Sequence, residues 1–157
     1  MKKLFKSSLL LSACCLALLS CNKTRFYTNR LDGEDWSATE LSVDGVSQSE
    51  LPFWKLSECN PYKELCSGDW SNHHGGKSIF FWQLRESAKK FEISNQSSTT
   101  GDHATDEAVM QCQFFSGIYD VVKRDKNEME FTSTNTVGYP GKKVVLKLAR
   151  GAHDHTH

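Results

Sequence analysis

The sequence lacks the residue patterns that identify the common classes of hydrolase and metal-binding protein. It holds no Gly-x-Ser-x-Gly nucleophile elbow, no His-Glu-x-x-His zinc motif and no calcium loop with EF-hand spacing. Residues 73–79, HHGGKSI, form an incomplete phosphate-binding loop, because Ser71 stands where that motif requires a glycine and the residues that follow favour a strand. We therefore expect neither an enzyme nor a bound cofactor.

An excess of charge of either sign is missing as well. The 157 residues include 19 Lys and Arg against 19 Asp and Glu, and no basic stretch alternates with aromatic residues as a surface for nucleic acid does. We expect no nucleic-acid partner. The length and the apolar content of 38% are those of one ordinary globular domain.

A long apolar run is also absent, because the stretch at residues 9–19 is too short to remain as a membrane-spanning helix. It follows Lys2, Lys3 and Lys6, an arrangement typical of an export signal. Residues 18–21, Leu-Leu-Ser-Cys, resemble the lipobox of bacterial lipoproteins. The resemblance implies cleavage after Ser20 and a diacylglycerol thioether on Cys21, with a further acyl chain such as palmitate, which together make a stable membrane anchor.

Two alternatives to this anchor stay open. Residues 11–14 also fit the lipobox, with a shorter apolar run before Cys14, and a signal without lipid is expected to be cut near Ser20. We take residues 1–20 as the signal peptide and residues 21–30 as the lipidated Cys21 and its tether. The residues after Cys21 are basic, whereas acidic residues there often mark surface export in such lipoproteins. This favours the periplasmic side of the outer membrane of the cell envelope.

From residue 31 the chain breaks into short segments with β periodicity, separated by turn residues. Residues 78–84, SIFFWQL, alternate two sets of bulky side chains, as in a strand covered on both faces. Further strands are expected at residues 35–43, 51–56, 89–95, 112–124, 128–134 and 142–150, and one helical turn is expected from Thr105. With no long amphipathic helix and no internal repeat, this pattern predicts an all-β antiparallel barrel or sandwich.

Several of these segments carry a family resemblance. They are Leu31-x-Gly33-x-x-Trp36, Val43-Asp44-Gly45, Gly68-Asp69-Trp70, residues 80–84 (FFWQL) and residues 116–121 (SGIYDV). Through these segments the chain resembles the small lipocalin-like lipoproteins of Bacteroidota-type bacteria. The resemblance implies an antiparallel up-and-down β-barrel of about 7–8 strands over residues 31–150, and no known reaction.

The interior of such a barrel must be filled by side chains or by one ligand. The aromatic residues that we expect to line a cavity are Trp36, Trp54, Phe80, Trp82, Phe115 and Tyr119. Two functions follow. The first is a membrane-anchored lipoprotein that binds a small apolar ligand. The alternative is a structural or protein-interaction lipoprotein, with an unknown partner, whose aromatic residues fill the barrel.

Three cysteines remain once the signal is removed and Cys21 is lipidated. An exported domain sits where disulfides form. Cys59 and Cys66 enclose an Asn-Pro turn and are the favoured pair, while pairing of either with Cys112 stays open. Cys112 with His103 is conceivable as a nucleophilic pair, although a buried structural cysteine is the simpler interpretation.

The last segment, residues 151–157, reads as a histidine-containing tail. His153, His155 and His157 alternate, so an extended tail places all three imidazoles on one side, and imidazole suits Zn, Cu and Ni. Metal scavenging by this tail is the weaker functional alternative, because ordering a flexible segment costs entropy and a solvated end explains the same residues.

Overall fold

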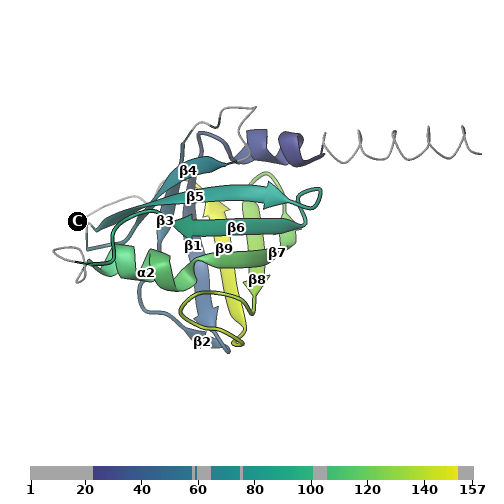
Figure 1. Ribbon diagram of the computed structural model, residues 1–157. Coiled ribbons are helices and arrows are strands. Elements are labelled where there is room, and N and C mark those ends of the chain that lie inside the picture. Colours follow the sequence, from purple (N-terminus) through teal and green to yellow (C-terminus); the bar gives the residue numbers. More distant parts are fainter. Residues whose placement is uncertain (1–22, 58, 60–64, 75, 101–105, 152–157) are drawn as a thin grey trace, which may run out of the picture.

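The structure, a computed structural model, describes residues 23–57, 59, 65–74, 76–100 and 106–151 (Figure 1). After a helix at residues 23–31, here called the N-terminal helix, the elements run in the following order: β1 (Asp35–Val43), β2 (Val46–Ser47), β3 (Phe53–Leu56), β4 (Cys66–Ser71), β5 (Lys77–Arg85), β6 (Lys90–Asn95), α2 (Glu107–Phe115), β7 (Gly117–Arg124), β8 (Glu128–Ser133) and β9 (Val144–Arg150).

The strands close into an antiparallel up-and-down barrel. Each of β3 to β9 pairs with its neighbour in sequence, β1 pairs with β3, and β9 returns to pair with β1 along most of its length. β2 only extends the hairpin that follows β1, so the barrel itself has eight strands. The predicted fold class, an all-β up-and-down barrel of about 7–8 strands, is confirmed.

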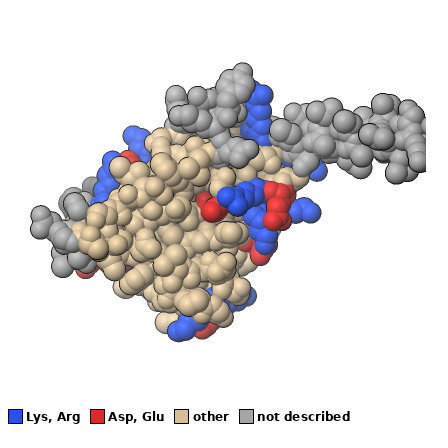
Figure 2. All heavy atoms as spheres, in the orientation of Figure 1, with Lys and Arg blue, Asp and Glu red and all other residues tan. Residues whose placement is uncertain are grey.

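The core is the barrel interior, and the sequence alternation decides which residues enter it. In β5, Phe80, Trp82 and Leu84 point inward and are buried, as their period of two predicts. The expectation that a second layer covers the outer face of β5 is wrong at Ile79, which is 50% exposed. Figure 2 shows a broad area without charged side chains on the face that carries β5, β6 and α2.

Helix α2 replaces the first part of a predicted strand. Residues 112–115 belong to it, and β7 begins only at Gly117. Asp106 caps the helix by accepting hydrogen bonds from the backbone N–H groups of Ala108 and Val109. Ala108, Cys112 and Phe115 follow at helical spacing and are buried, so burial of one helical face outweighs the strand-like composition of this segment.

The two helices lie at opposite ends of the barrel (Figure 1). α2 packs against β4, β5 and β6 on the side where β5 begins. The N-terminal helix packs where β5 ends, and it leads into β1 through Gly33, whose φ of 70° suits a glycine. Within the described residues no helix has the length and apolar character needed to cross a membrane.

The disulfide joins Cys59 and Cys66, which confirms the favoured pairing and leaves Cys112 as a free buried thiol. The bridge closes the connection between β3 and β4 at the end of the barrel where the N-terminal helix lies. There the backbone N–H of Cys59 donates to Asp32 Oδ1 at 2.5 Å, just beyond the end of that helix. The disulfide therefore helps to hold the connection between the helix and β1.

Candidate functional site

The barrel interior is organised around a row of three tryptophans. Trp36, Trp54 and Trp70 are direct cross-strand partners on β1, β3 and β4. Because the strands of a closed barrel are tilted, this row crosses the interior from the N-terminal helix toward α2. The indole rings of Trp54 and Trp70 lie 5.4 Å apart, so the row is continuous at its α2 end.

All six residues that the sequence pointed to as cavity-lining lie in this interior, each with at most 2% of its surface exposed. Trp54 contacts Phe80 at a ring distance of 5.3 Å, and Phe115 stacks on Trp70 at 6.5 Å. Further aromatic contacts of the interior involve Phe91 and Phe131, which are absent from the predicted set; among these contacts are Trp82–Phe91, Phe91–Phe131 and Tyr119–Phe131. The signal for Phe91 and Phe131 was their inward position in strands of period two.

The four indole N–H groups differ in whether they have a hydrogen-bond acceptor. Trp70 donates to Gln111 Oε1 at 2.9 Å and Trp82 donates to the Ser67 carbonyl at 3.0 Å. The N–H groups of Trp36 and Trp54 are buried and have no acceptor among the described residues. A buried donor without a partner costs about 1–3 kcal/mol, so these two groups are an unusual feature of an otherwise apolar interior.

α2 covers one end of the barrel, and residues along the helix contact the strands beneath it. Gln111 accepts from Trp70 and donates to the Glu50 carbonyl at 2.9 Å, and so joins the helix to β4 and to the connection before β3. Asn95 at the end of β6 donates to Gln113 Oε1 at 3.0 Å. The hydroxyl of Tyr119 donates to the Phe115 carbonyl at the end of the helix.

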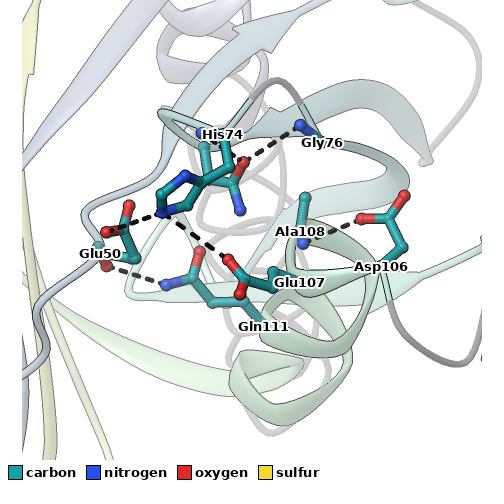
Figure 3. Close-up of polar contacts among 8 residues, drawn as sticks. Glu50, His74, Gly76, Asp106, Glu107, Ala108 and Gln111 are labelled. Atoms are coloured by element: carbon teal, nitrogen blue, oxygen red, sulfur yellow. Dashed lines mark hydrogen bonds and ion pairs between the residues drawn. The ribbon is translucent and has the colours of Figure 1, made fainter.

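A polar cluster surrounds the first turn of α2 (Figure 3). His74 Nε2 lies 3.3 Å from Glu50 Oε1 and 3.9 Å from Glu107 Oε2. The turn that carries His74 is held by Asn72 Oδ1, which accepts from the backbone N–H groups of His74 and Gly76. His74 therefore links the β4–β5 turn to the first turn of α2 through Glu107 and to the connection before β3 through Glu50.

Gly76 explains why the glycine-rich stretch at residues 73–79 exists. A Cβ at this position would lie 2.9 Å from Asp106 Oδ1 and 3.0 Å from the Ala108 side chain, so only glycine lets the turn approach the start of α2. Lys77 and Ser78 then open β5, not a helix. The segment is a docking turn for α2, in agreement with its rejection as a phosphate loop.

The opposite end of the barrel holds a small pocket beneath the N-terminal helix. Its walls include Tyr27, Leu31, Trp36, Leu84 and Met129, and its enclosed volume is about 10 Å³, room for about one water molecule. The Arg124 guanidinium lies over the Tyr27 ring at 4.2 Å from its centroid and donates to the Ala88 carbonyl. This end is thus closed by aromatic and cationic contacts.

Cys112 is poorly suited to nucleophilic chemistry. It is buried inside α2, and loss of solvation raises the pKa of its thiol to about 12, against an ordinary value of 9.0. Burial raises the pKa of the Tyr119 hydroxyl as well. Within the described part of the chain, no group of three or more His, Cys, Asp or Glu side chains could hold a metal ion.

Several predicted residues lie outside the described residues. They are Cys21, His103 and the tail histidines His153, His155 and His157. Lipidation of Cys21 and metal binding by the tail therefore stay predictions.

The geometry defines a closed, antiparallel up-and-down barrel with an aromatic interior and a helix over each end. No protein-family model matches the chain, and no curated protein matches its sequence. Among solved structures, Japanin from Rhipicephalus appendiculatus, bound to cholesterol, is similar at 8% identity over 76% of each chain, with a TM-score of 0.47. Similarity at this level says nothing about what this chain binds.

Proposed function

We propose that this protein is a lipid-anchored lipoprotein of the cell envelope whose barrel binds one small, mainly apolar ligand that carries an oxygen acceptor. The observation that carries the proposal is the pair of buried indole N–H groups, on Trp36 and Trp54, with no acceptor among the described residues. An oxygen of the ligand would complete their hydrogen bonding, while its apolar body would contact the aromatic rings.

The ligand enters at the end covered by α2. The aromatic rings already touch one another, so entry requires α2 and the rings below it to shift. The contacts that hold the edge of α2, from Gln111, Gln113 and Glu107, are polar contacts that water can replace. Each contributes only about 1 kcal/mol net, so the rim of α2 opens readily, and ligand entry then has to displace the buried face that Phe115 anchors on Trp70.

The ligand is tested with the chain that begins at Asn22, which keeps every described residue. We expect it to bind a fluorescent fatty acid, and Trp54→Phe to weaken that binding about tenfold because the ring stays but the donor is lost. Trp82→Phe is the matched control, since its N–H already serves the Ser67 carbonyl. Absence of binding, or equal losses in the two variants, contradicts the proposal.

A second candidate is the filled barrel that serves as a structural or protein-interaction module. It is supported by the close stacking of the interior, such as Phe91 on Phe131 at 4.8 Å. It requires no retained small molecule in native mass spectra of the protein purified from cells. It also requires Trp54→Phe to lower the free energy of unfolding less than Trp82→Phe does, because both lose the same volume but only Trp82 loses a hydrogen bond.

The anchor is tested separately in cells that process lipoproteins. We expect the full chain to incorporate labelled palmitate, Cys21→Ala to abolish incorporation, and Cys14→Ala to leave it intact. Labelling that survives Cys21→Ala contradicts an anchor at this residue. The weaker metal hypothesis requires Zn binding, measured by calorimetry, to disappear when residues 151–157 are removed.

A further inference from the structure

The N-terminal helix presents two different faces. Its inner face carries Leu31, which is buried, and Tyr27, which packs against the barrel core. Its outer face carries Phe26, which is 57% exposed although phenylalanine is among the most apolar side chains. The helix therefore needs only its inner face to cover the barrel.

The charges on the outer face all have one sign. Lys23 and Arg30 lie three residues before and four residues after Phe26, so they share its side of the helix, and Arg25 lies next to it. All three cations are exposed, and residues 22–31 include no acidic residue. Among the described residues, none of the three cations takes part in an ion pair.

This local charge opposes that of the rest of the exported chain. Residues 1–20 contain three lysines and no acidic residue, so the remainder has 16 basic and 19 acidic residues, a net charge of about −3. The Arg30 guanidinium lies 5.4 Å from the centroid of the Phe26 ring. Three cations without an ion pair among the described residues, gathered around one exposed aromatic ring, are the pattern of a helix that lies on a lipid surface, with its ring at the headgroup boundary and its cations beside phosphates.

We propose that this outer face, formed by Lys23, Arg25, Phe26 and Arg30, docks on the anionic phospholipids of the membrane and holds the α2 end of the barrel away from it. The direction of docking rests on the proposed function, because the lipidated Cys21 stands two residues before Lys23. The contact itself needs no acyl chain. It leaves the ligand entrance under α2 open to the aqueous side.

The contact is measured with the unlipidated chain from Asn22, by co-sedimentation with vesicles of phosphatidylcholine alone or mixed with phosphatidylglycerol. We expect binding only to the anionic vesicles, weakened by salt. Replacing Lys23, Arg25 and Arg30 together with Gln is expected to weaken binding about a hundredfold, since each cation near an anionic surface contributes about fivefold. Phe26→Ser is expected to weaken it about fivefold.

The matched control replaces three exposed lysines elsewhere, Lys55, Lys142 and Lys143, with Gln. It changes the net charge by the same amount and is expected to leave vesicle binding nearly unchanged. Near-ultraviolet circular dichroism checks that each variant keeps its packed aromatic interior. Equal binding to neutral vesicles, no binding to anionic vesicles, or equal losses in both triple variants overturns the proposal.

Failure of the membrane-docking proposal can be distinguished from failure of the proposed function. Vesicle binding by the unlipidated chain depends on neither the acyl chains nor a barrel ligand. Palmitate labelling and the fatty-acid titration report on those two independently. A chain that is labelled and binds the probe, but ignores anionic vesicles, would keep the proposed function and lose this inference.

Discussion

The two ends of the barrel are both covered by a helix, but they are closed by different chemistry. At the α2 end the contacts around Gln111 and His74 are mostly polar and lie at the rim. At the other end Leu31 is buried, Arg124 covers the Tyr27 ring, and the Cys59–Cys66 bridge stands beside the helix. Polar rim contacts exchange readily with water, whereas buried side chains and a disulfide do not.

The comparison indicates which end opens. At the α2 end, Asp44 and Lys143 exchange two hydrogen bonds of 2.8 Å that fasten the end of β1 to the start of β9. At the N-terminal end, Arg150 in β9 pairs with Glu34, and the backbone N–H of Gly151 donates to the Asp35 carbonyl at 2.9 Å. These contacts fasten the start of β1 to the end of β9, so the barrel seam closes directly beside the N-terminal helix. We therefore infer that the polar edge of α2 is the part of this cover that moves, while Phe115 keeps its inner face attached and the N-terminal helix stays fixed.

The largest expected effect comes from the apolar residue that attaches α2. Phe115 is buried and stacks on Trp70, so Phe115→Ala should lower the free energy of unfolding by about 4 kcal/mol. Its neighbour Phe114 is 40% exposed, and Phe114→Ala should cost less than about 1 kcal/mol. Urea denaturation measures both. Similar losses in the two variants would mean that α2 is not held by its inner face.

A smaller effect is expected at the cap of α2. Asp106→Ala removes the acceptor for two backbone N–H groups and should cost the helix about 1 kcal/mol, which corresponds to about fivefold more frequent opening. Cys112 reports this opening. The raised pKa of its buried thiol keeps it neutral in the closed state at pH 8, so a thiol reagent reacts when the helix opens.

Asp125→Ala is the matched control for this prediction. Asp125 accepts from the backbone N–H groups of Asn127 and Glu128 in the β7–β8 turn, which lies at the opposite end. These hydrogen bonds hold the pKa of Asp125 below its usual value, so their contribution to stability is present at neutral pH and is lost as the pH falls. We expect this variant to leave the labelling rate of Cys112 unchanged. An equal increase in the labelling rate would contradict the prediction that the two ends open independently.

The sequence predicted the barrel better than its ends because the two depend on different information. Alternation along β5 is local, and it placed Phe80 and Trp82 correctly in the interior. The Cys59–Cys66 pair is also local, since only six residues separate its members. Local patterns are the information that a single sequence carries.

The features that the sequence did not predict depend on contacts between residues that are distant in the chain. The tryptophan row requires the register of β1, β3 and β4, which no local pattern gives. The pairing of β1 with β9 also shifts register between Ala38 and Glu40, which no sequence pattern predicted. Residues 112–115 were assigned to a strand because their aromatic pair favours one, and α2 forms there because its buried face meets Trp70. The link from Trp70 to Gln111 joins residues 41 positions apart.

The smallest expected effect lies at the fixed end. Arg124→Gln removes the cation over the Tyr27 ring, an interaction of about 0.5–1 kcal/mol at a partly exposed site, so the N-terminal helix should unravel two to five times more often. The backbone N–H of Asp32 donates to the Thr28 carbonyl in the last turn of this helix, and its hydrogen exchange measures the unravelling. Lys123→Gln is the matched control, since that side chain pairs only with Asp125 and Glu128 among the described residues and should leave this exchange unchanged. Because the described residues of the two ends share no polar contact, Arg124→Gln should also leave the labelling rate of Cys112 unaltered. Faster labelling would instead mean that the covers open together, which would assign both helices to one cooperative unit.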